Sequence, residues 1–349
     1  MSDTTRPADA NTSPLLQIRD LKMHFPIKEA AGLGRTKKVV QAVDGVSFDL
    51  KPGRVLGLVG ESGCGKSTTG RMITRLLTPT AGQILFKGTD IARMKEKQLR
   101  PFRRQLQIVF QDPYSSLNPR QTVSNILTTP LRVHNLVPKG QELARVQELL
   151  ERVGLNPEHH NRYPNEFSGG QRQRIGIARA LAVEPEVIIA DEPVSALDVS
   201  IQAQVMNLME DLRRDLGIAF VFIAHDLGVV RHFCDEVAVM YLGKIVEQGP
   251  RDQIYNAPQH PYTQALLSAA PDLGTIRGTP PKERIRLVGD VPSPIDPPSG
   301  CRFRTRCWKA EDICATQEPL LIAKPKSGPG HAAACHFAEP KVDLTAATA

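Results

Sequence analysis

The chain has 349 residues, of which 41% are hydrophobic, so it is long and apolar enough for one large domain or two smaller ones. Its formal net charge of +7 suits phosphate, anionic lipid or nucleic-acid ligands, and equally an ordinary solvated surface. No run reaches the roughly 18 apolar residues of a membrane helix. The polar residues 1–14 lack the apolar centre of a signal peptide. We therefore expect a disordered tail there and a protein that stays in the cytoplasm.

The first structural elements are expected to be antiparallel strands. Residues 15–59 alternate apolar and polar side chains in short runs, with a loop rich in Gly, Ala and Lys from Lys28 to Lys38. Val55 to Val59 is expected to be a compact apolar strand. A glycine-rich loop follows it directly, and Ser67 to Leu77 is expected to be a helix. This strand–loop–helix order is the context that a phosphate-binding loop requires.

The middle of the chain alternates helical and strand patterns. Apolar side chains recur at helical spacing within residues 122–155, which predicts a helical insertion; they are Leu143, Val146, Leu149, Leu150 and Val153. Val187 to Ala190 and Ile218 to Ala224 are typical of buried strands. Between them, Ser200 to Leu216 has one apolar helical face. Alternating strands and helices predict an α/β core with a mostly parallel sheet.

The composition changes after Gly249. Seven prolines between residues 271 and 300 exclude a regular helix or a central strand, so an extended linker is expected. Four of the six cysteines occur near or after the end of this linker. In a reducing compartment such a group favours a metal site over disulfides.

The glycine-rich loop, Gly60 to Ser67, matches the phosphate-loop pattern. Its glycines let successive backbone N–H groups point at phosphate oxygens. Lys66 is expected to reach the β- and γ-phosphates of a nucleotide, and the Ser67 hydroxyl to ligate Mg²⁺. An ordinary glycine-rich turn is the alternative, and the flanking strand and helix oppose it.

The apolar strand Val187 to Ala190 leads directly into two acids, Asp191 and Glu192. Such a strand delivers Asp191 to the Mg²⁺ side of the phosphates. Glu192 is then placed to orient and polarise the attacking water. A strand that simply ends in solvent is the alternative, but a phosphate loop predicts an acid on a neighbouring strand.

A second glycine-rich segment, Phe167 to Gln171, precedes a strong helical run from Arg172 to Leu181. Small residues at a helix N-terminus favour an anion site, although an ordinary helix cap has the same composition. The segment lies 20 residues before Asp191.

These motifs resemble those of the nucleotide-binding subunits of ABC transporters. Phe167 to Gln171 resembles the signature LSGGQ, with Phe in place of Leu. Ser195 to Asp198 resembles the D-loop, His225 the switch histidine, and Gln111 the Q-loop glutamine that senses Mg²⁺ and the γ-phosphate. The motifs fall in the family's order.

The resemblance, which covers about residues 15–250, implies an α/β P-loop NTPase core of ABC type with an antiparallel β-subdomain and a helical subdomain at about 112–180. A C-terminal extension follows at 251–349. The implied contacts to ATP come from Phe25 (stacking on adenine), Gly60, Ser62, Gly63, Cys64, Gly65, Lys66, Ser67, Thr68, Gln111, Ser168, Gly169, Gly170, Gln171, Asp191 and Asp198. Of these, Ser67, Gln111 and Asp191 are the implied Mg²⁺ ligands, and Glu192, His225 and Gln111 are the implied catalytic residues.

In this family two subunits clamp two ATP molecules head to tail, so Ser168, Gly169 and Gly170 are implied to serve the ATP held by a second ATPase subunit. The segment Gln259 to Leu266, the proline-rich linker and the cysteines resemble the oligopeptide/dipeptide importer branch, closest to its second ATPase subunit. This resemblance implies two transmembrane permease subunits, an extracytoplasmic solute-binding protein and a position on the cytoplasmic face of the inner membrane. Related importers for nickel and other solutes share the extension, so the solute stays open.

The cysteines Cys301, Cys307, Cys314 and Cys335 have five, six and 20 residues between them. Zinc knuckles usually place two to four residues between paired cysteines, so zinc is the less natural ligand. Four thiolates suit a [4Fe–4S] cluster, which some members of the importer branch carry here, and unliganded thiols or disulfides are the further alternative. Three neighbouring arginines are candidates for charge compensation; they are Arg302, Arg304 and Arg306.

Two other functions have to be weighed against an importer ATPase. Soluble ABC ATPases of translation carry two cassettes in one chain, and those of repair carry long coiled-coil or zinc-hook insertions, whereas this chain has one cassette and a short insertion. A regulatory protein that binds ATP without using it is opposed by the presence of Glu192 and His225. A polyphosphate and an anionic membrane face account for the basic charge, so no nucleic-acid partner is expected.

Overall fold

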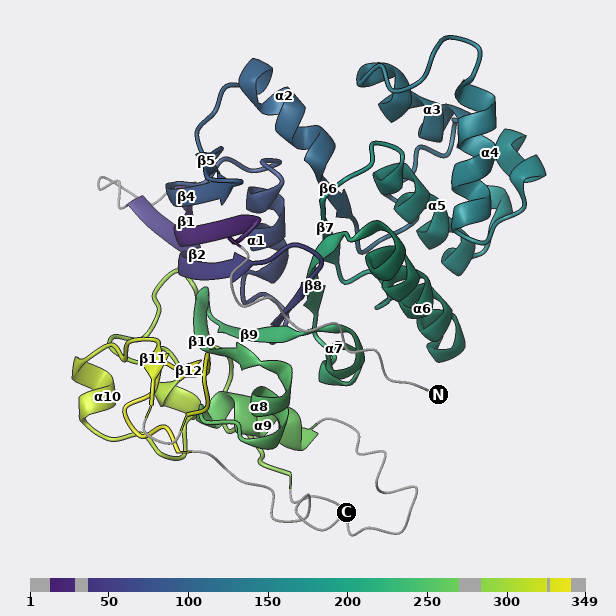
Figure 1. The fold of residues 1–349 in the computed structure, drawn as a ribbon. Helices are drawn as coiled ribbons and strands as arrows, with labels where there is room; N and C mark the ends of the chain where they lie inside the picture. The colour runs from purple at the N-terminus through teal and green to yellow at the C-terminus, as the bar shows by residue number, and fades with distance from the viewer. Residues whose placement is uncertain (1–12, 29–36, 270–283, 325–326, 340–349) are drawn as a thin grey trace, which may run out of the picture.

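The computed structural model describes residues 13–28, 37–269, 284–324 and 327–339 (Figure 1). Several predicted features fall mainly outside these residues: the N-terminal tail, the loop between the first two strands, and the first part of the proline-rich linker. The described remainder of that linker, residues 284–300, contains neither helix nor strand, as its prolines predict.

A four-stranded antiparallel sheet lies on one side of the molecule (Figure 1). Its order is β2-β1-β4-β5, with β1 at Leu16–Lys28, β2 at Lys37–Leu50, β4 at Ala81–Phe86 and β5 at Thr89–Asp90. The pairing of β1 with β2 and with β4 confirms the antiparallel strands predicted for this part of the chain.

The central sheet has eight strands in the order β11-β12-β10-β9-β3-β8-β7-β6. Its parallel part consists of β3 (Val55–Val59), β6 (Leu106–Val109), β7 (Val187–Asp191), β8 (Ala219–Ala224) and β9 (Glu236–Tyr241). The expected mostly parallel α/β core is therefore confirmed. At one edge three antiparallel strands are added, β10 (Lys244–Pro250), β11 (Ile322–Ala323) and β12 (Ala332–Ala333).

The helices are α1 (Lys66–Ile73), α2 (Glu96–Gln105), α3 (Val123–Val133), α4 (Glu142–Arg152), α5 (Gly169–Leu181), α6 (Val199–Leu216), α7 (Leu227–Phe233), α8 (Arg251–Asn256), α9 (Pro261–Ala269) and α10 (Ile313–Thr316). The helix predicted from Ser67 to Leu77 ends early, at Ile73, because Arg75 takes a left-handed backbone conformation with φ of 55°.

The central sheet separates two apolar cores, because successive side chains of a strand point to opposite faces. Leu56 and Leu58 of β3 pack with the antiparallel sheet and α1. Val55 and Val59 of the same strand pack into the other core, which also contains side chains of α5, α6 and α7. The continuous apolar runs of these strands reflect burial on both faces.

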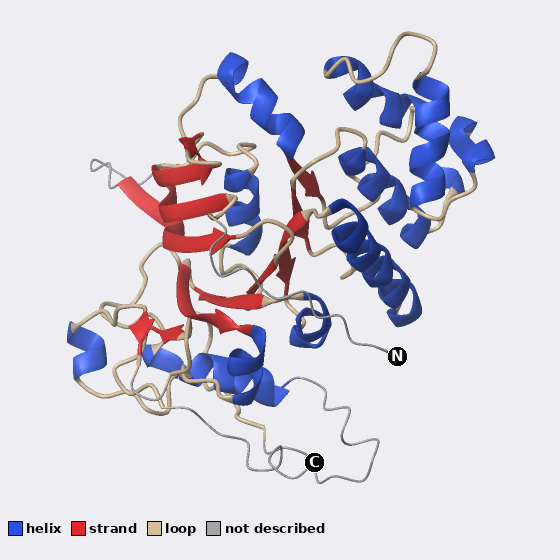
Figure 2. Ribbon diagram, in the orientation of Figure 1, coloured by secondary structure: helices blue, strands red, loops and turns tan. Residues whose placement is uncertain are grey.

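The region between β6 and β7 contains no strand and projects from the sheet as a group of helices (Figure 2). It contains α3 and α4, which confirms the helical insertion. Val146, Leu149 and Leu150 of α4 are buried as their spacing predicts, whereas Leu143 in the first turn of that helix is exposed.

The described residues after β10 pack against the central sheet, at its β10 edge (Figure 1). Strand β12 pairs with β10, and the backbone N–H of Gln41 in β2 donates to the Pro294 carbonyl at 2.9 Å. This C-terminal extension therefore contacts both sheets, and its contacts reach the loop between β3 and α1.

Candidate functional site

The loop between β3 and α1 depends on glycines at its two ends. Gly65 has φ of 106°, a left-handed conformation that side chains rarely adopt. A Cβ atom there would lie 2.2 Å from the carbonyl oxygen of Ala42, so β2 leaves no room for a larger residue. The loop is therefore held tightly against the antiparallel sheet, and α1 begins directly after it with Lys66.

Lys66 is buried at the centre of the site, with 4% of its surface exposed. Its ammonium donates to the carbonyl oxygens of Gly60 at 2.8 Å and Glu61 at 3.0 Å, and lies 4.0 Å from Glu192 Oε1. The loop's own backbone thus orients the cation, and its contact with nucleotide phosphates stays a prediction.

Two oxygen-bearing side chains meet at the start of α1. The Ser67 hydroxyl donates to Asp191 Oδ1 at 2.7 Å, across 124 positions of the chain. Burial raises the pKa of Asp191 above its usual value, against the hydrogen bond from Ser67. A hydroxyl and a carboxylate side by side are hard oxygen donors of the kind that Mg²⁺ prefers, so this pair fits the ion.

Glu192 is the point on which the other predicted catalytic residues converge. The Gln111 amide donates to Glu192 Oε2 at 2.9 Å, and His225 Nδ1 lies 3.3 Å from the same oxygen. Glu192 has φ of 45°, a strained conformation for a residue with a side chain. The end of β7 is therefore held in a conformation that places the carboxylate between Gln111, at the end of β6, and His225, at the end of β8.

All of the residues whose side chains make these contacts, except Asp191, line one cavity of about 430 Å³. Its walls are formed by Ala42, Ser62, Gly63, Gly65, Lys66, Ser67, Thr68, Gln111, Glu192 and His225. The carboxyl ends of parallel strands supply most of them, which is where open α/β sheets bind ligands. The cavity brings the Lys66 ammonium and the Gln111 amide next to the Glu192 carboxylate, an arrangement suited to a polyphosphate and a water molecule.

Residues from three other predicted parts of the site do not line this cavity. Ser168 caps α5, accepting from the Gln171 N–H at 3.4 Å, and is outside the lining together with Gly169 and Gly170. Asp198 caps α6 and also lies outside the lining. Phe25 is on β1 with 38% of its surface exposed, so its ring is available for stacking but does not line the cavity.

The structure gives two residues contacts that the sequence did not predict. Arg306 pairs with Glu61 of the phosphate loop, and the Tyr262 hydroxyl accepts from the Glu61 N–H at 2.8 Å. Both partners come from the C-terminal extension. No local pattern marks them, because the contacts join segments about 200 residues or more apart.

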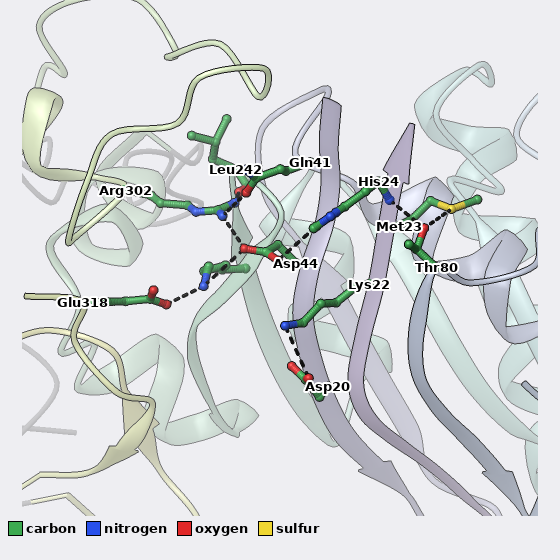
Figure 3. A network of polar contacts seen from close by, with 11 residues as sticks. Asp20, Lys22, Met23, His24, Gln41, Asp44, Thr80, Leu242, Arg302 and Glu318 are labelled. Carbon is green, nitrogen blue, oxygen red and sulfur yellow. Dashed lines mark hydrogen bonds and ion pairs between the residues drawn. The ribbon is translucent and has the colours of Figure 1, made fainter. Parts of the chain in front are cut away.

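A charged network joins the extension to the antiparallel sheet (Figure 3). Asp44 of β2 pairs with Arg302 and His24, and its carboxylate also lies 3.5 Å from Lys244. Burial by itself would raise the pKa of Asp44, but Lys244, Arg302 and His24 outweigh it and hold that pKa below its usual value. Arg302 also donates to the Leu242 carbonyl.

The four late cysteines are free thiols. Burial, assisted by the charges of the other three cysteines, raises the pKa of Cys301 to about 11. Within the described residues no three His, Cys, Asp or Glu side chains are arranged to hold a metal ion. The three arginines that were expected to balance the charge of a cysteine-bound cluster have other partners. Arg302 and Arg306 pair with carboxylates, and Arg304 donates to Ser299.

Comparison with known proteins identifies the class. The model of the ABC transporter family matches residues 43–195, and that of the oligopeptide/dipeptide transporter C-terminal region matches residues 246–314. Among solved structures, the ATP-binding cassette MJ0796 in a dimeric post-hydrolysis state with ADP and phosphate aligns with a TM-score of 0.60 at 27% identity. It covers 68% of this chain and 98% of that cassette. The fold is thus that of an ABC-type ATPase.

Two curated relatives narrow the assignment. The oligopeptide transport ATP-binding protein AppF of Bacillus subtilis is 55% identical over 94% of this chain and 98% of its own length. The dipeptide transport ATP-binding protein DppF of Escherichia coli is 52% identical over 88% and 91%. The chain belongs to the ABC transporter ATP-binding family, in the branch with the oligopeptide/dipeptide C-terminal region. In the described part of the chain, no helix is long and apolar enough to cross a membrane.

Proposed function

We propose that this protein is the ATP-hydrolysing subunit of an ABC importer that energises uptake of di- or oligopeptides across the cytoplasmic membrane. The observation that carries the hydrolytic part is the convergence of Gln111 and His225 on Glu192, within 4.0 Å of Lys66. The names of the relatives, which describe oligopeptide and dipeptide transport, support the solute class.

In this proposal Lys66 and the backbone of the phosphate loop bind the β- and γ-phosphates of ATP. Ser67 and Asp191, with Gln111, would hold Mg²⁺, and the ion would supply positive charge to the phosphates. Glu192 accepts a proton from the water that attacks the γ-phosphate. Gln111 orients this carboxylate from one side, and His225 from the other.

We also propose that the site is completed by a second ATPase subunit. Ser168, Gly169 and Gly170 form the N-terminus of α5, where free backbone N–H groups favour an anion. They do not line their own chain's cavity, so they are available to the ATP of a partner chain. Asp198, near the same surface, is proposed to lie at that junction. Resemblance favours a partner that differs from this chain.

The proposed assembly contains two transmembrane permeases and an extracytoplasmic solute-binding protein, with this chain bound peripherally at the cytoplasmic face of the membrane. Its proposed domains are a nucleotide-binding domain at 15–250, a helical subdomain at about 112–180 within it, and the extension at 251–349. An importer ATPase for nickel or another solute is the alternative. A soluble ABC ATPase of translation or repair fits less well, because the transporter C-terminal region matches residues 246–314.

The four late cysteines are proposed to bind a [4Fe–4S] cluster, with Zn²⁺ as the alternative. Support comes from the backbone hydrogen bond from the Cys301 N–H to the Cys314 carbonyl at 2.8 Å, which holds two of the four cysteines close together. In the described part of the chain these thiols are not arranged as a ligand set, so the proposal requires that binding of the cluster rearranges them. Iron and acid-labile sulfide analysis of anaerobically purified protein tests this; absence of both overturns the cluster.

The test of the main proposal uses the complex assembled in membrane vesicles with its permeases and binding protein. Glu192→Gln is expected to abolish hydrolysis at this site and to leave ATP binding intact, because Gln accepts no proton. The partner ATPase site is disabled in every sample, so that the remaining turnover belongs to this chain. Unchanged ATPase activity in the Glu192→Gln complex contradicts the assignment.

Transport is measured in the same vesicles with labelled peptides and with nickel. Peptide-dependent stimulation of ATP hydrolysis, lost in Glu192→Gln, is the expected result. If nickel but not peptides stimulates ATP hydrolysis, the protein is an importer ATPase for nickel, which is the alternative. Tight, salt-sensitive binding of RNA or DNA without stimulation by either solute favours the soluble class.

A further inference from the structure

Two side chains of the C-terminal extension reach the phosphate loop at a single residue, Glu61. Arg306 Nη1 lies 2.7 Å from Glu61 Oε2 and its Nη2 lies 3.2 Å from Oε1, a bidentate pair. The Tyr262 hydroxyl accepts a hydrogen bond from the Glu61 N–H at 2.8 Å. Both polar ends of Glu61 are therefore held by a part of the chain outside the cassette.

The Arg306–Glu61 pair is shielded from solvent, with 9% and 27% of the two side chains exposed. Burial by itself would lower the pKa of Arg306, but the hydrogen bonds and charge of Glu61 outweigh it and raise that pKa. The guanidinium is therefore always charged, and it neutralises the only carboxylate of the loop Gly60 to Ser67. A shielded pair of this kind is screened by salt much less than an exposed one.

Tyr262 is held just as firmly. It is fully buried, and its ring lies 4.7 Å from that of Tyr241 and 5.4 Å from that of Phe303, measured between centroids. Packing among these rings fixes the direction of the hydroxyl. Because the Glu61 N–H donates its proton to this fixed hydroxyl, the hydrogen bond sets the orientation of the backbone turn at Glu61.

That orientation matters because Glu61 also holds the catalytic cation. Its carbonyl oxygen accepts from Lys66 Nζ at 3.0 Å, next to the bond from Lys66 to Gly60. The Gly60 carbonyl and the Glu61 N–H belong to one planar peptide unit, so a rotation of the unit that Tyr262 holds moves one of the two acceptors that orient Lys66. The contacts form a continuous path from the extension, through Glu61, to the group that meets the phosphates.

We propose that Arg306 and Tyr262 are positioning residues for nucleotide binding: Arg306 cancels the charge of Glu61 beside the phosphates, and Tyr262 fixes the loop turn that orients Lys66. The inference rests on the proposed nucleotide site and goes beyond it. It makes the C-terminal extension part of the ATP site of its own chain.

If Arg306 acts through its charge, its loss weakens ATP binding more than ADP binding, a difference that loss of folding would not produce. Without Arg306, the Glu61 carboxylate repels a polyphosphate, and the repulsion grows with the charge of the ligand. ATP is therefore affected more than ADP. Without the Glu61 carboxylate, the repulsion is absent whether or not residue 306 is charged. The two single substitutions thus act in opposite directions on ATP affinity.

The experiment is calorimetric titration of the full-length protein with ATP and with ADP, at low and high salt. Arg306→Gln is expected to weaken ATP binding about tenfold and ADP binding about threefold, more at low salt. Glu61→Gln binds ATP at least as tightly as the native chain, and the double variant returns to within about twofold of it. Arg304→Gln is the matched control and leaves both affinities unchanged, because Arg304 lies two residues away and its side chain donates to Ser299 instead of Glu61.

The charge role is overturned if Arg306→Gln weakens the binding of ATP and of ADP equally. It is also overturned if the double variant binds ATP as weakly as Arg306→Gln does. Arg306→Lys keeps the charge and is expected to retain ATP affinity within about threefold, which separates this role from misfolding. A native chain that does not bind ATP in the same titration overturns the proposed function itself. A native chain that binds ATP and variants that bind it equally well overturn the further inference alone.

The role of Tyr262 is tested by Tyr262→Phe, which removes the hydroxyl and keeps the ring packing. ATP affinity is expected to fall about fivefold, because the Glu61 N–H loses its acceptor and the turn loosens. The matched control is Tyr255→Phe, whose buried hydroxyl donates to the Leu227 carbonyl away from the loop. Equal ATP affinity in Tyr262→Phe and Tyr255→Phe overturns this part of the proposal.

Discussion

His260 makes the C-terminal extension sensitive to acid. The side chain is 1% exposed, and its Nδ1 accepts from the Tyr262 N–H at 3.1 Å. Burial lowers the pKa of His260 from 6.5 to about 4, although the nearby Glu247 carboxylate opposes the shift. Between these values the unfolded chain binds a proton and the folded chain does not. The free energy of unfolding therefore falls as the pH is lowered through this window.

The size of the effect follows from the shift. One pKa unit corresponds to about 1.36 kcal/mol, so the native fold loses about 2 kcal/mol between neutral pH and about pH 5 through His260 alone. The loss reaches about 3 kcal/mol near pH 4. Losses of this size are a large part of the usual stability of a domain. The contacts at risk include those that place Tyr262 against the phosphate loop.

The assay is urea unfolding of the full-length protein at several pH values, comparing the native chain with His260→Gln. The variant has no group that titrates here, so it is expected to lose about 2 kcal/mol less on acidification from about pH 7.5 to pH 5. His232→Gln is the matched control, because His232 is exposed. Equal losses in the native chain and in His260→Gln refute the reasoning.

Two further substitutions test the supporting structure. Gly65→Ala is expected to abolish ATP binding, because the new Cβ atom would lie 2.2 Å from the Ala42 carbonyl oxygen. Gly63→Ala is the comparison and should retain weaker binding, because no atom lies within 4 Å of its Cβ position. Equal ATP affinities of the two variants in a titration contradict this prediction. Asp44→Asn is expected to lower the melting temperature at neutral pH. The pKa of Asp44 in the folded chain lies below the usual 3.8, so the ionised carboxylate stabilises the fold at pH values above 3.8. That difference should shrink in acid as the native carboxylate takes up a proton, and an unchanged difference at about pH 3 counts against the network.

Much of the fold was predictable because its signals are local. Strand β3 was predicted with its observed ends, since a run of apolar residues followed by a glycine-rich loop has few alternative structures. The helix α1 was predicted four residues too long at its C-terminal end, because the left-handed conformation of Arg75 depends on how the following loop packs. Leu143 follows the helical spacing of its neighbours but remains exposed, since spacing does not show how wide the buried face is.

The sequence by itself determined the nature of the candidate site. Two short motifs follow strands of the parallel sheet: Gly65, Lys66 and Ser67 after β3, and Asp191 and Glu192 at the end of β7. Parallel strands bring their carboxyl ends to one edge of the sheet, wherever the strands lie in the chain. The close approach of Gln111 and His225 to Glu192 agrees with their predicted roles. Gln111 and His225 were assigned by their resemblance to the family's motifs, and their roles stay predictions.

Only the tertiary structure decided what the C-terminal extension does. Arg306 was expected to balance the charge of a cysteine cluster, yet it pairs with Glu61 across 245 positions of the chain. Tyr262 meets the same residue across 201 positions. An arginine pairs with whichever carboxylate the packing brings within reach, and no periodicity or motif encodes that choice. The extension reaches the phosphate loop because its strand β12 joins the central sheet beside β10, a pairing of distant segments that only folding establishes.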